Sequence, residues 1–141
     1  MADKITFRPL TVSDVHFLAE YAAICEGIID ITEIEKVEAR LKKRVENPNY
    51  IGVTTLINNK RVGFIDGIIV KETLELNEIY VTKQYRSQGI GIKLVEEILL
   101  IAKSRGAKQA IYYTEPDNIV MQKLGEKAGF QLKSLLYEKK L

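Results

Sequence analysis

One short segment has the composition of a loop that holds a phosphorylated ligand; it reads Arg86, Ser87, Gln88, Gly89, Ile90, Gly91. Glycine has no Cβ, so positions 89 and 91 let the backbone approach a ligand closely. An apolar strand is predicted before the segment, over residues 74–81, and a helix is predicted to begin near Ile92. The first amides of a helix have no intrahelical partner, and the helix dipole favours negative charge there. Together, the strand, the glycine turn and the helix start predict a pyrophosphate cradle.

The strand before this cradle has an irregular apolar pattern, with one pair at Leu74 and Leu76 and a second pair at Ile79 and Val81. Strict alternation cannot put both pairs on one face, because Ile79 lies three positions after Leu76, an odd offset. One extra residue near Asn77 and Glu78, a β-bulge, would restore a single apolar face and point Glu75 away from it. The alternative is a strand that is buried on both sides at its C-terminal end.

Composition sets broad limits on function. The chain has 141 residues, long enough for one domain, expected over 1–141, and its formal charge of +2 is too balanced to favour nucleic acid. Cys25 is the single cysteine, so no intrachain disulfide can form and a cytoplasmic location is favoured. No apolar run approaches the roughly 20 residues of a membrane span. A lone histidine, His16, and a lone cysteine predict no metal site.

Periodicity and turn residues predict the order β-α-α-β-β-β-α-β-α-β-β, an α/β (α+β) chain with a mixed central sheet flanked by helices. Strands are expected over 5–8, 50–57, 61–70, 74–81, 109–114, 130–133 and 135–140. Helices are expected from Thr11 or Ser13 to about Ala23, over 32–46, from Ile92 to about Arg105, and from about Asn118 to Ala128.

The pattern Arg86-x-x-Gly89-x-Gly91 after a bulged strand resembles the acyl-CoA signature of the GNAT-type (Gcn5-related) N-acetyltransferases. The element order also fits that family, so the resemblance covers essentially the whole chain and implies a single-domain GNAT acyl-CoA N-acyltransferase fold. A nucleotide-binding domain is the weaker alternative, because neither G-x-G-x-x-G nor G-x-x-x-x-G-K-[ST] occurs. Further matching segments flank the pattern: Ile79-Tyr80-Val81 before it, and Asn118…Leu124…Lys127-Ala128-Gly129-Phe130 after it.

The resemblance implies an N-acetyltransferase that moves an acetyl group from acetyl-CoA directly to a primary amine of a small molecule or protein, with no metal. Backbone amides of residues 86–91 would hold the pyrophosphate, and the main chain of residues 79–81, above all Ile79 and Val81, would pair with pantetheine like an added strand. Asn118 would contact pantetheine or substrate, or only cap a helix. No nucleic-acid or membrane partner is implied, and a homodimer is compatible with the resemblance.

Two positions depart from the family pattern. Met121 stands where alanine is frequent, and Gly125 stands where a tyrosine often protonates the leaving thiolate. General acid catalysis contributes roughly 10²–10⁴-fold. Another group therefore serves as the acid, or the thiolate leaves without one. A catalytically inactive acyl-CoA-binding module of the same fold is the alternative function.

An amine must lose its proton before it attacks a thioester, because an ammonium with a reference pKa of about 10.4 is rarely neutral at pH 7. Glu75 is the first candidate base, since family members often carry a base at the matching position, and Glu78 is the reserve. Tyr113, five residues before Asn118, is the candidate to donate to the thiolate or orient a water. Glu75 and Tyr113 are expected on opposite walls of one cleft, with a backbone amide near Val81 meeting the oxyanion.

The acceptor amine is not specified by the sequence. Its site is expected between the first two helices, the loop over residues 25–30 and the last strands near Tyr137. Glu26 and Asp30 in that loop could attract a cationic amine, or they could simply be solvated.

Overall fold

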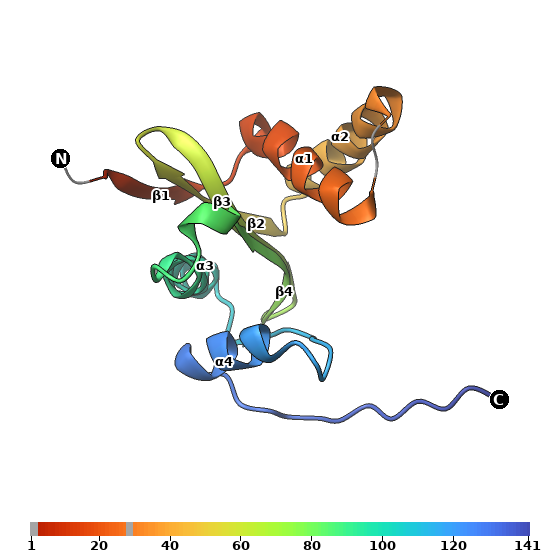
Figure 1. The fold of residues 1–141 in the computed structure, drawn as a ribbon. Helices are drawn as coiled ribbons and strands as arrows, with labels where there is room; N and C mark the ends of the chain where they lie inside the picture. The colour runs from red at the N-terminus through yellow and green to blue at the C-terminus, as the bar shows by residue number, and fades with distance from the viewer. Residues whose placement is uncertain (1–2, 28–29) are drawn as a thin grey trace.

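The computed structural model describes residues 3–27 and 30–141, apart from the side chain of Glu26. Figure 1 shows a central sheet with helices on both faces. Two short 3-10 turns, Val12–Asp14 and Lys83–Tyr85, interrupt the connections. The elements in chain order are β1 (Ile5–Pro9), α1 (Val15–Glu26), α2 (Ile31–Glu46), β2 (Tyr50–Ile57), β3 (Lys60–Val70), β4 (Thr73–Val81), α3 (Ile90–Ser104), β5 (Gln109–Ile111) and α4 (Ile119–Lys127).

The five strands lie in sequence order, β1-β2-β3-β4-β5. The first four form an antiparallel meander, and β5 joins β4 in parallel after the α3 crossover. α1 and α2 lie on one face of the sheet and α3 on the other (Figure 1). The expected mixed sheet flanked by helices is confirmed, and a parallel pair needs such a helical crossover.

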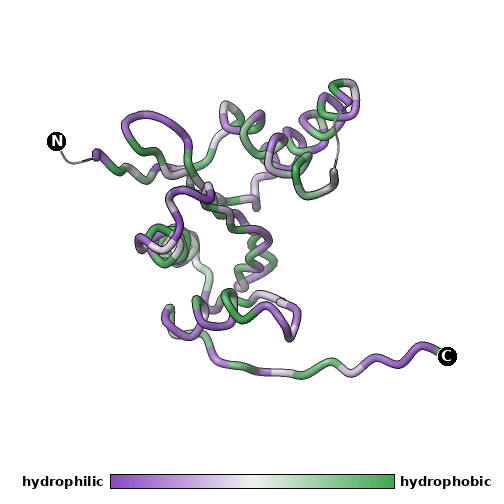
Figure 2. Tube along the Cα trace, viewed as in Figure 1, coloured by the Kyte–Doolittle hydropathy of each residue, from purple (hydrophilic) through white to green (hydrophobic). Residues whose placement is uncertain are grey.

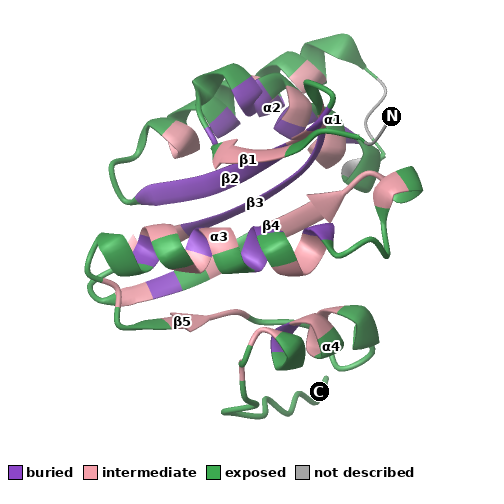
Figure 3. Ribbon diagram, turned by 90° about the vertical axis from the view of Figure 1, so that its left-hand side faces the viewer, coloured by how far each residue is buried: buried purple, intermediate pink, exposed green. Residues whose placement is uncertain are grey.

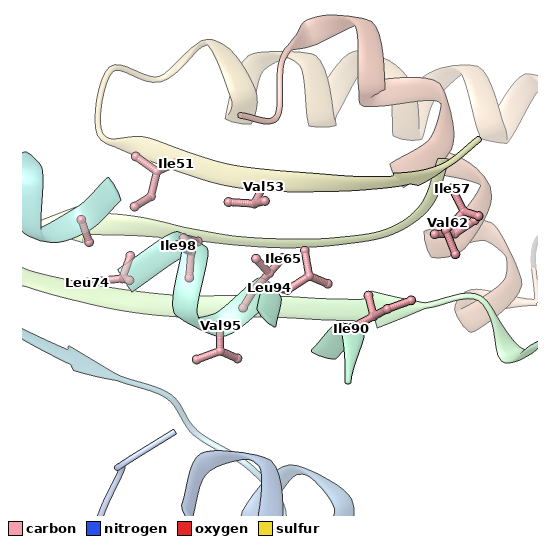
Figure 4. Packing of buried hydrophobic residues seen from close by; sticks show 11 residues of the cluster. Ile51, Val53, Ile57, Val62, Ile65, Leu74, Ile90, Leu94, Val95 and Ile98 are labelled. Atoms are coloured by element: carbon pink, nitrogen blue, oxygen red, sulfur yellow. The ribbon is translucent and has the colours of Figure 1, made fainter. Parts of the chain in front are cut away.

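The core on the α3 face consists of aliphatic side chains. α3 has its buried residues at helical spacing, and they pack in one cluster with residues of β2, β3 and β4. Figure 4 shows ten of them by name: Ile51, Val53, Ile57, Val62, Ile65, Leu74, Ile90, Leu94, Val95 and Ile98.

The core on the α1 and α2 face contains an aromatic cluster instead. Phe64 of β3 and Tyr80 of β4 pack against Phe17 and Tyr21 of α1, with the Tyr21 and Tyr80 ring centroids 4.3 Å apart. Such ring pairs add about 0.5–1.5 kcal/mol each beyond their buried area. Tyr80 is therefore held against α1, on the sheet face opposite the α3 core.

A buried ion cluster ties α1 to the sheet. Arg8 donates from both terminal nitrogens to the Asp14 carboxylate at 2.7 Å, and Arg61 Nε donates to it at 2.7 Å. Thr54 Oγ1 donates to the same carboxylate at 3.0 Å. Burial alone would raise the pKa of Asp14, but the hydrogen bonds from Arg8 and Arg61 outweigh it and hold that pKa well below its usual range.

The last two predicted strands, 130–133 and 135–140, are wrong: the structure has an extended tail there with no strand. One reason is local, since a single residue, Ser134, separates the two segments and hairpin loops have at least two residues. Every residue of 131–141 is exposed. The fifth strand is also shorter than expected, because β5 ends at Ile111 and not near Thr114. Among the helices of the described residues, none has the length and apolar character needed to cross a membrane.

Candidate functional site

β4 contains the predicted bulge. In its pairing with β3, Gly67 lies opposite Leu76 and Asp66 lies opposite Glu78, so Asn77 is an extra residue. Leu74, Leu76, Ile79 and Val81 all pack into the core on the α3 face. The bulge and the single apolar face are thereby confirmed, and Tyr80 packs on the opposite face, so the C-terminal end of the strand is covered on both sides as well.

Asp66 satisfies the backbone of the bulge. Its Oδ1 accepts from the Glu78 amide at 3.1 Å, and its Oδ2 accepts from the Tyr50 hydroxyl at 2.7 Å. Asp66 is 1% exposed, and burial raises the pKa of its carboxyl to about 6. A bulge leaves ladder hydrogen bonds unmade, so the carboxylate takes the place of a missing carbonyl. Sequence reasoning missed this residue, although an aspartate within an apolar strand was a usable signal.

The sheet opens beside the bulge. β5 pairs with β4 only at Thr73, Leu74 and Glu75. Beyond that point β4 and the chain after β5 diverge, as Figure 3 shows. The edge of β4 that faces β5 is thus open along its C-terminal half, where an extended ligand could add as a strand. The crevice between the two is lined mainly by Leu76, Glu78 and Ile79 on one side and by Tyr112, Tyr113, Leu124 and Gly125 on the other.

The open edge leads to the glycine turn. Gly89 is the N-cap of α3 with φ +83°, and a Cβ built there would meet open space. No side chain caps this helix end, so the amides of Ile90, Gly91 and Ile92 are available to an anion. Gly91 differs from Gly89, because a Cβ at position 91 would make ordinary contact with Leu124 at 3.8 Å.

The side chain of Arg86 stabilises the glycine turn through contacts with the end of β4. Arg86 donates from Nε to the Val81 carbonyl at 2.7 Å, and its guanidinium lies 5.7 Å from the centre of the Tyr80 ring. Arg86 therefore fixes the turn against the end of β4. Ser87 has φ +64° and is exposed, and Gln88 is also exposed.

The structure separates the candidate acid–base residues. Glu75 is exposed at the point where β4 still pairs with β5, and it is not among the crevice residues. Glu78 lines the crevice, and its Oε1 lies 3.7 Å from Nη1 of Arg44 in α2. Tyr113 lines the opposite wall and is 87% exposed. Tyr113 and Glu78 therefore line the same crevice, whereas Glu75 lies outside that crevice.

Tyr112 was missed by the sequence reasoning. Its hydroxyl donates to the Met121 carbonyl at 2.8 Å, and its ring packs edge-on against Phe130. A Cβ at position 125 would lie 1.8 Å from this hydroxyl, so Tyr112 occupies the space that any side chain at Gly125 would need. Burial raises the pKa of the Tyr112 hydroxyl. A glycine inside a helix was a usable signal, because it can mark a position where another side chain packs directly against the helix backbone.

Asn118 and the acceptor loop have local roles. Asn118 is the N-cap of α4, and its Oδ1 accepts from the Met121 amide at 3.2 Å. Asp30 likewise caps α2: its Oδ1 accepts from the Thr32 hydroxyl and from the Thr32 amide, the latter at 2.9 Å, and these two hydrogen bonds lower the pKa of Asp30. Residues 28 and 29 and the side chain of Glu26 lie outside the described residues. Tyr137 lies on the extended tail and is 87% exposed.

The architecture is that of an N-acetyltransferase. The structure aligns over its whole length with 98% of the aminoglycoside N-acetyltransferase AAC(6')-Iy in complex with CoA, at a TM-score of 0.80 and 14% identity. The chain belongs to the Acetyltransferase (GNAT) family, whose model matches residues 17–130.

Two curated relatives are similar in sequence. The chain is 32% identical over 82 residues to N-alpha-acetyltransferase 30 of Schizosaccharomyces pombe, covering 52% of this chain and 55% of that protein. It is 29% identical over 144 aligned positions to an uncharacterised N-acetyltransferase of Methanocaldococcus jannaschii, covering 93% of this chain and 62% of that one. The chain therefore spans between half and two thirds of the length of these relatives.

Proposed function

We propose that this chain is an acetyl-CoA-dependent N-acetyltransferase that transfers the acetyl group directly to a primary amine of a small molecule or protein. The observation that carries the proposal is the open edge of β4, which runs from the bulge at Asn77 to the uncapped start of α3 at Gly89. An open strand edge suits the amides of pantetheine, and an uncapped helix start suits a pyrophosphate.

In this proposal the main chain of residues 79–81 pairs with pantetheine, and the amides of residues 86–91 hold the pyrophosphate. The open space at the Gly89 Cβ position supports a close approach of the phosphates to the backbone. The side chain of Arg86 positions the turn through its hydrogen bond to the Val81 carbonyl, and the proposal assigns it no phosphate contact. Asn118 caps the start of α4 by accepting a hydrogen bond from the Met121 amide, and in this proposal that helix start lies beside the pantetheine.

The chemistry requires a base, and in this proposal an acid assists the departure of the thiolate. The base removes a proton from the ammonium, and the neutral amine attacks the thioester carbonyl carbon. The tetrahedral oxyanion is met by a backbone amide near Val81, and the carbon–sulfur bond then breaks. As the amide forms, the attacking nitrogen loses its second proton to water, and the departing thiolate takes a proton from the acid and leaves as CoA. For the base, family matching favours Glu75, whereas the crevice lining favours Glu78.

For the acid we propose Tyr113. The Gly125 position cannot supply one, and the Tyr112 hydroxyl is already donated to the Met121 carbonyl. Tyr113 lines the crevice with an exposed side chain, so its hydroxyl is available to a thiolate. Proton donation by a positioned side chain contributes roughly 10²–10⁴-fold.

The acceptor is proposed to enter on the face of α1 and α2, where Glu78 meets Arg44. The similar proteins act on different amines by name, an aminoglycoside in one case and an alpha-amine in another. The acceptor is therefore proposed only as a primary amine. A cytoplasmic location is proposed as well, supported by the free and exposed Cys25.

The test is release of free CoA thiol from acetyl-CoA in the presence of a polyamine, an amino acid, an aminoglycoside and a peptide with a free N-terminus. Turnover with at least one of these amines, absent in Gly89→Val, is the expected result. Acetyl-CoA binding without turnover on any amine would instead support the inactive acyl-CoA-binding module. The observation behind that second candidate is the loss of the helix acid at Gly125 together with the engaged Tyr112 hydroxyl.

A further inference from the structure

Asp66 is a carboxylate buried inside the sheet, at the position of β3 that faces the bulge of β4. β3 is hydrophobic before and after it (Figure 2). A buried carboxylate is costly unless hydrogen bonds satisfy it, and both oxygens of Asp66 accept one, from the Glu78 amide and from the Tyr50 hydroxyl. An apolar side chain at position 66 would avoid this cost. Stability alone therefore does not explain the carboxylate, and its contact with Glu78 points to the site.

β3 shapes the bulge at two adjacent residues, Asp66 and Gly67. A Cβ built at Gly67 would lie 2.6 Å from the carbonyl oxygen of Glu75, which is closer than side chains come. Gly67 thus gives β4 room to depart from the regular ladder, and Asp66 supplies the acceptor for the displaced Glu78 amide. The neighbouring strand therefore specifies where β4 bulges.

The bulge decides which face of β4 carries the Glu78 side chain. Side chains alternate along a regular strand, so Glu78 would share the α3 face with Leu76. Asn77 is the extra residue, and after it Ile79 returns to the α3 core. Glu78 is thereby turned to the opposite face, where its Oε1 lies 3.7 Å from Nη1 of Arg44 in α2. That is the face on which the acceptor amine is proposed to enter.

Asp66 also connects Glu78 to the end of α2. Tyr50, which donates to Asp66 at 2.7 Å, begins β2, and its amide donates to the carbonyl of Asn47, the C-cap of α2. Arg44 lies in the last turn of the same helix. The backbone and the carboxylate of Glu78 are therefore both held from the C-terminal end of α2. Holding a reacting group in a fixed geometry is a large part of what lowers a reaction barrier.

We propose that Asp66 is a positioning residue for acetyl transfer that acts through Glu78. It holds the bulge that directs the Glu78 carboxylate toward the acceptor ammonium, from which Glu78 takes the proton. Asp66 touches neither substrate, because it is buried inside the sheet. The inference rests on the proposed function, with Glu78 as the base.

Hydrogen exchange of the Glu78 amide, followed by NMR at neutral pH, tests the hold directly. The wild-type amide should be protected, because it donates to a buried carboxylate. Asp66→Ala should speed its exchange by at least about tenfold, because the donor loses its acceptor. Asp66→Asn should keep the protection, since its amide oxygen accepts the same hydrogen bond and its amino group donates to the Tyr50 oxygen. An unprotected Glu78 amide in the wild type, a measurement that requires no variant to fold, would overturn the inference.

The kinetics separate positioning from a general loss of structure. Measured per acetyl-CoA-binding molecule, Asp66→Ala should lower kcat by about tenfold or more, and Asp66→Asn should restore most of it. KM for acetyl-CoA should stay within about threefold of the wild-type value, because residues 79–81 pair with β3 beyond the bulge.

Thr54→Ala is the matched control for these kinetics. It too loses a buried hydrogen bond of the sheet, and β3 separates Thr54 from β4. Thr54→Ala should leave kcat unchanged. An equal loss of kcat in Thr54→Ala and Asp66→Ala, or a full kcat in Asp66→Ala, would overturn the inference.

A double-mutant cycle tests whether Asp66 acts through Glu78. In the Glu78→Gln background, Asp66→Ala should lower kcat by no more than about twofold further, because the side chain that it positions has already lost its basicity. Losses that multiply would overturn the inference. A wild type without turnover on any amine would overturn the proposed function itself. In an active enzyme, a Glu78 amide that exchanges equally fast in the wild type and in Asp66→Ala would overturn the inference alone, so the two failures are distinguishable.

Discussion

The buried carboxylate of Asp66 links the core to the bulge at the centre of the site. It accepts hydrogen bonds from the Tyr50 hydroxyl and from the Glu78 amide, and it is 1% exposed. Burial raises its pKa to about 6, which exceeds the value of about 3.9 for an unfolded aspartate. Asp66 therefore holds its proton in the folded state over a pH range in which the unfolded chain has lost it.

The first prediction concerns the pH dependence of stability. Between about pH 4 and pH 6 the folded protein binds more protons at Asp66, so the free energy of unfolding should fall as pH rises through this window. The change is on the order of 2–3 kcal/mol. Asp66→Asn should abolish this slope in urea denaturation at stepped pH, because an amide does not titrate. A slope that survives unchanged in Asp66→Asn would refute the assignment.

The second prediction separates the two candidate bases. Glu78→Gln should lower kcat/KM at neutral pH by about 10²-fold or more and leave acetyl-CoA affinity unchanged, because Glu78 lines the crevice. The loss should shrink toward pH 10, where the amine is neutral without help. Glu75→Gln serves as the matched control, with the same change three residues away. Should Glu75→Gln carry the loss, the base is the residue favoured by family matching.

The third prediction concerns the acid. Tyr113→Phe should lower kcat by about tenfold or more with acetyl-CoA affinity unchanged, since it removes a free hydroxyl in the crevice. Tyr112→Phe should instead cost about 1 kcal/mol of stability, the loss of its hydrogen bond to Met121, and little of kcat. Rates and urea midpoints of both variants check this. A full rate in Tyr113→Phe would show that the thiolate leaves by another route.

At the scale of elements, β4 and the start of α3 build the site. The bulge in β4 was predictable, because the spacing of four apolar residues left no other single-faced arrangement. The glycine turn was predictable as well, because few residues other than glycine adopt φ +83° readily. The two terminal strands could not be predicted reliably. A strand forms only where it can pair with a neighbouring strand, and the local sequence does not specify that neighbour.

The fourth prediction compares the two glycines of the turn. Gly89→Ala should lower stability by about 1–2 kcal/mol, because alanine is strained at positive φ, and it should weaken acetyl-CoA binding. Gly91→Ala should leave stability unchanged or raise it by up to about 1 kcal/mol, because its Cβ fits against Leu124 within a helix. Thermal denaturation and calorimetry of the two variants provide the comparison. Equal destabilisation by both would contradict the geometry of the turn.

At the scale of the whole molecule, the sheet separates two cores and opens at one end. Aromatic packing against α1 and aliphatic packing against α3 hold β2, β3 and β4 between two layers of helices. β5 pairs with β4 at three residues only, so the sheet opens beside the bulge. The element order up to α4 could be read from periodicity, and the sheet order follows from the meander and the crossover.

Part of the candidate site could not be predicted at this scale. Glu75 and Glu78 differ by their position relative to the point where β5 departs, and strand lengths of a few residues are not encoded in local patterns. Asp66 and Tyr112 act through contacts with segments distant in sequence, such as Tyr50 and Met121. Such contacts emerge only from the packed structure.

The measurement that tests the central claim most directly is a calorimetric titration of the purified full chain with acetyl-CoA, with NADH and ATP as controls and Gly89→Val alongside. The account predicts micromolar binding of acetyl-CoA by the wild type, no comparable binding of NADH or ATP, and loss of acetyl-CoA binding in Gly89→Val. Absence of acetyl-CoA binding, preference for either nucleotide, or undiminished affinity in Gly89→Val would contradict it.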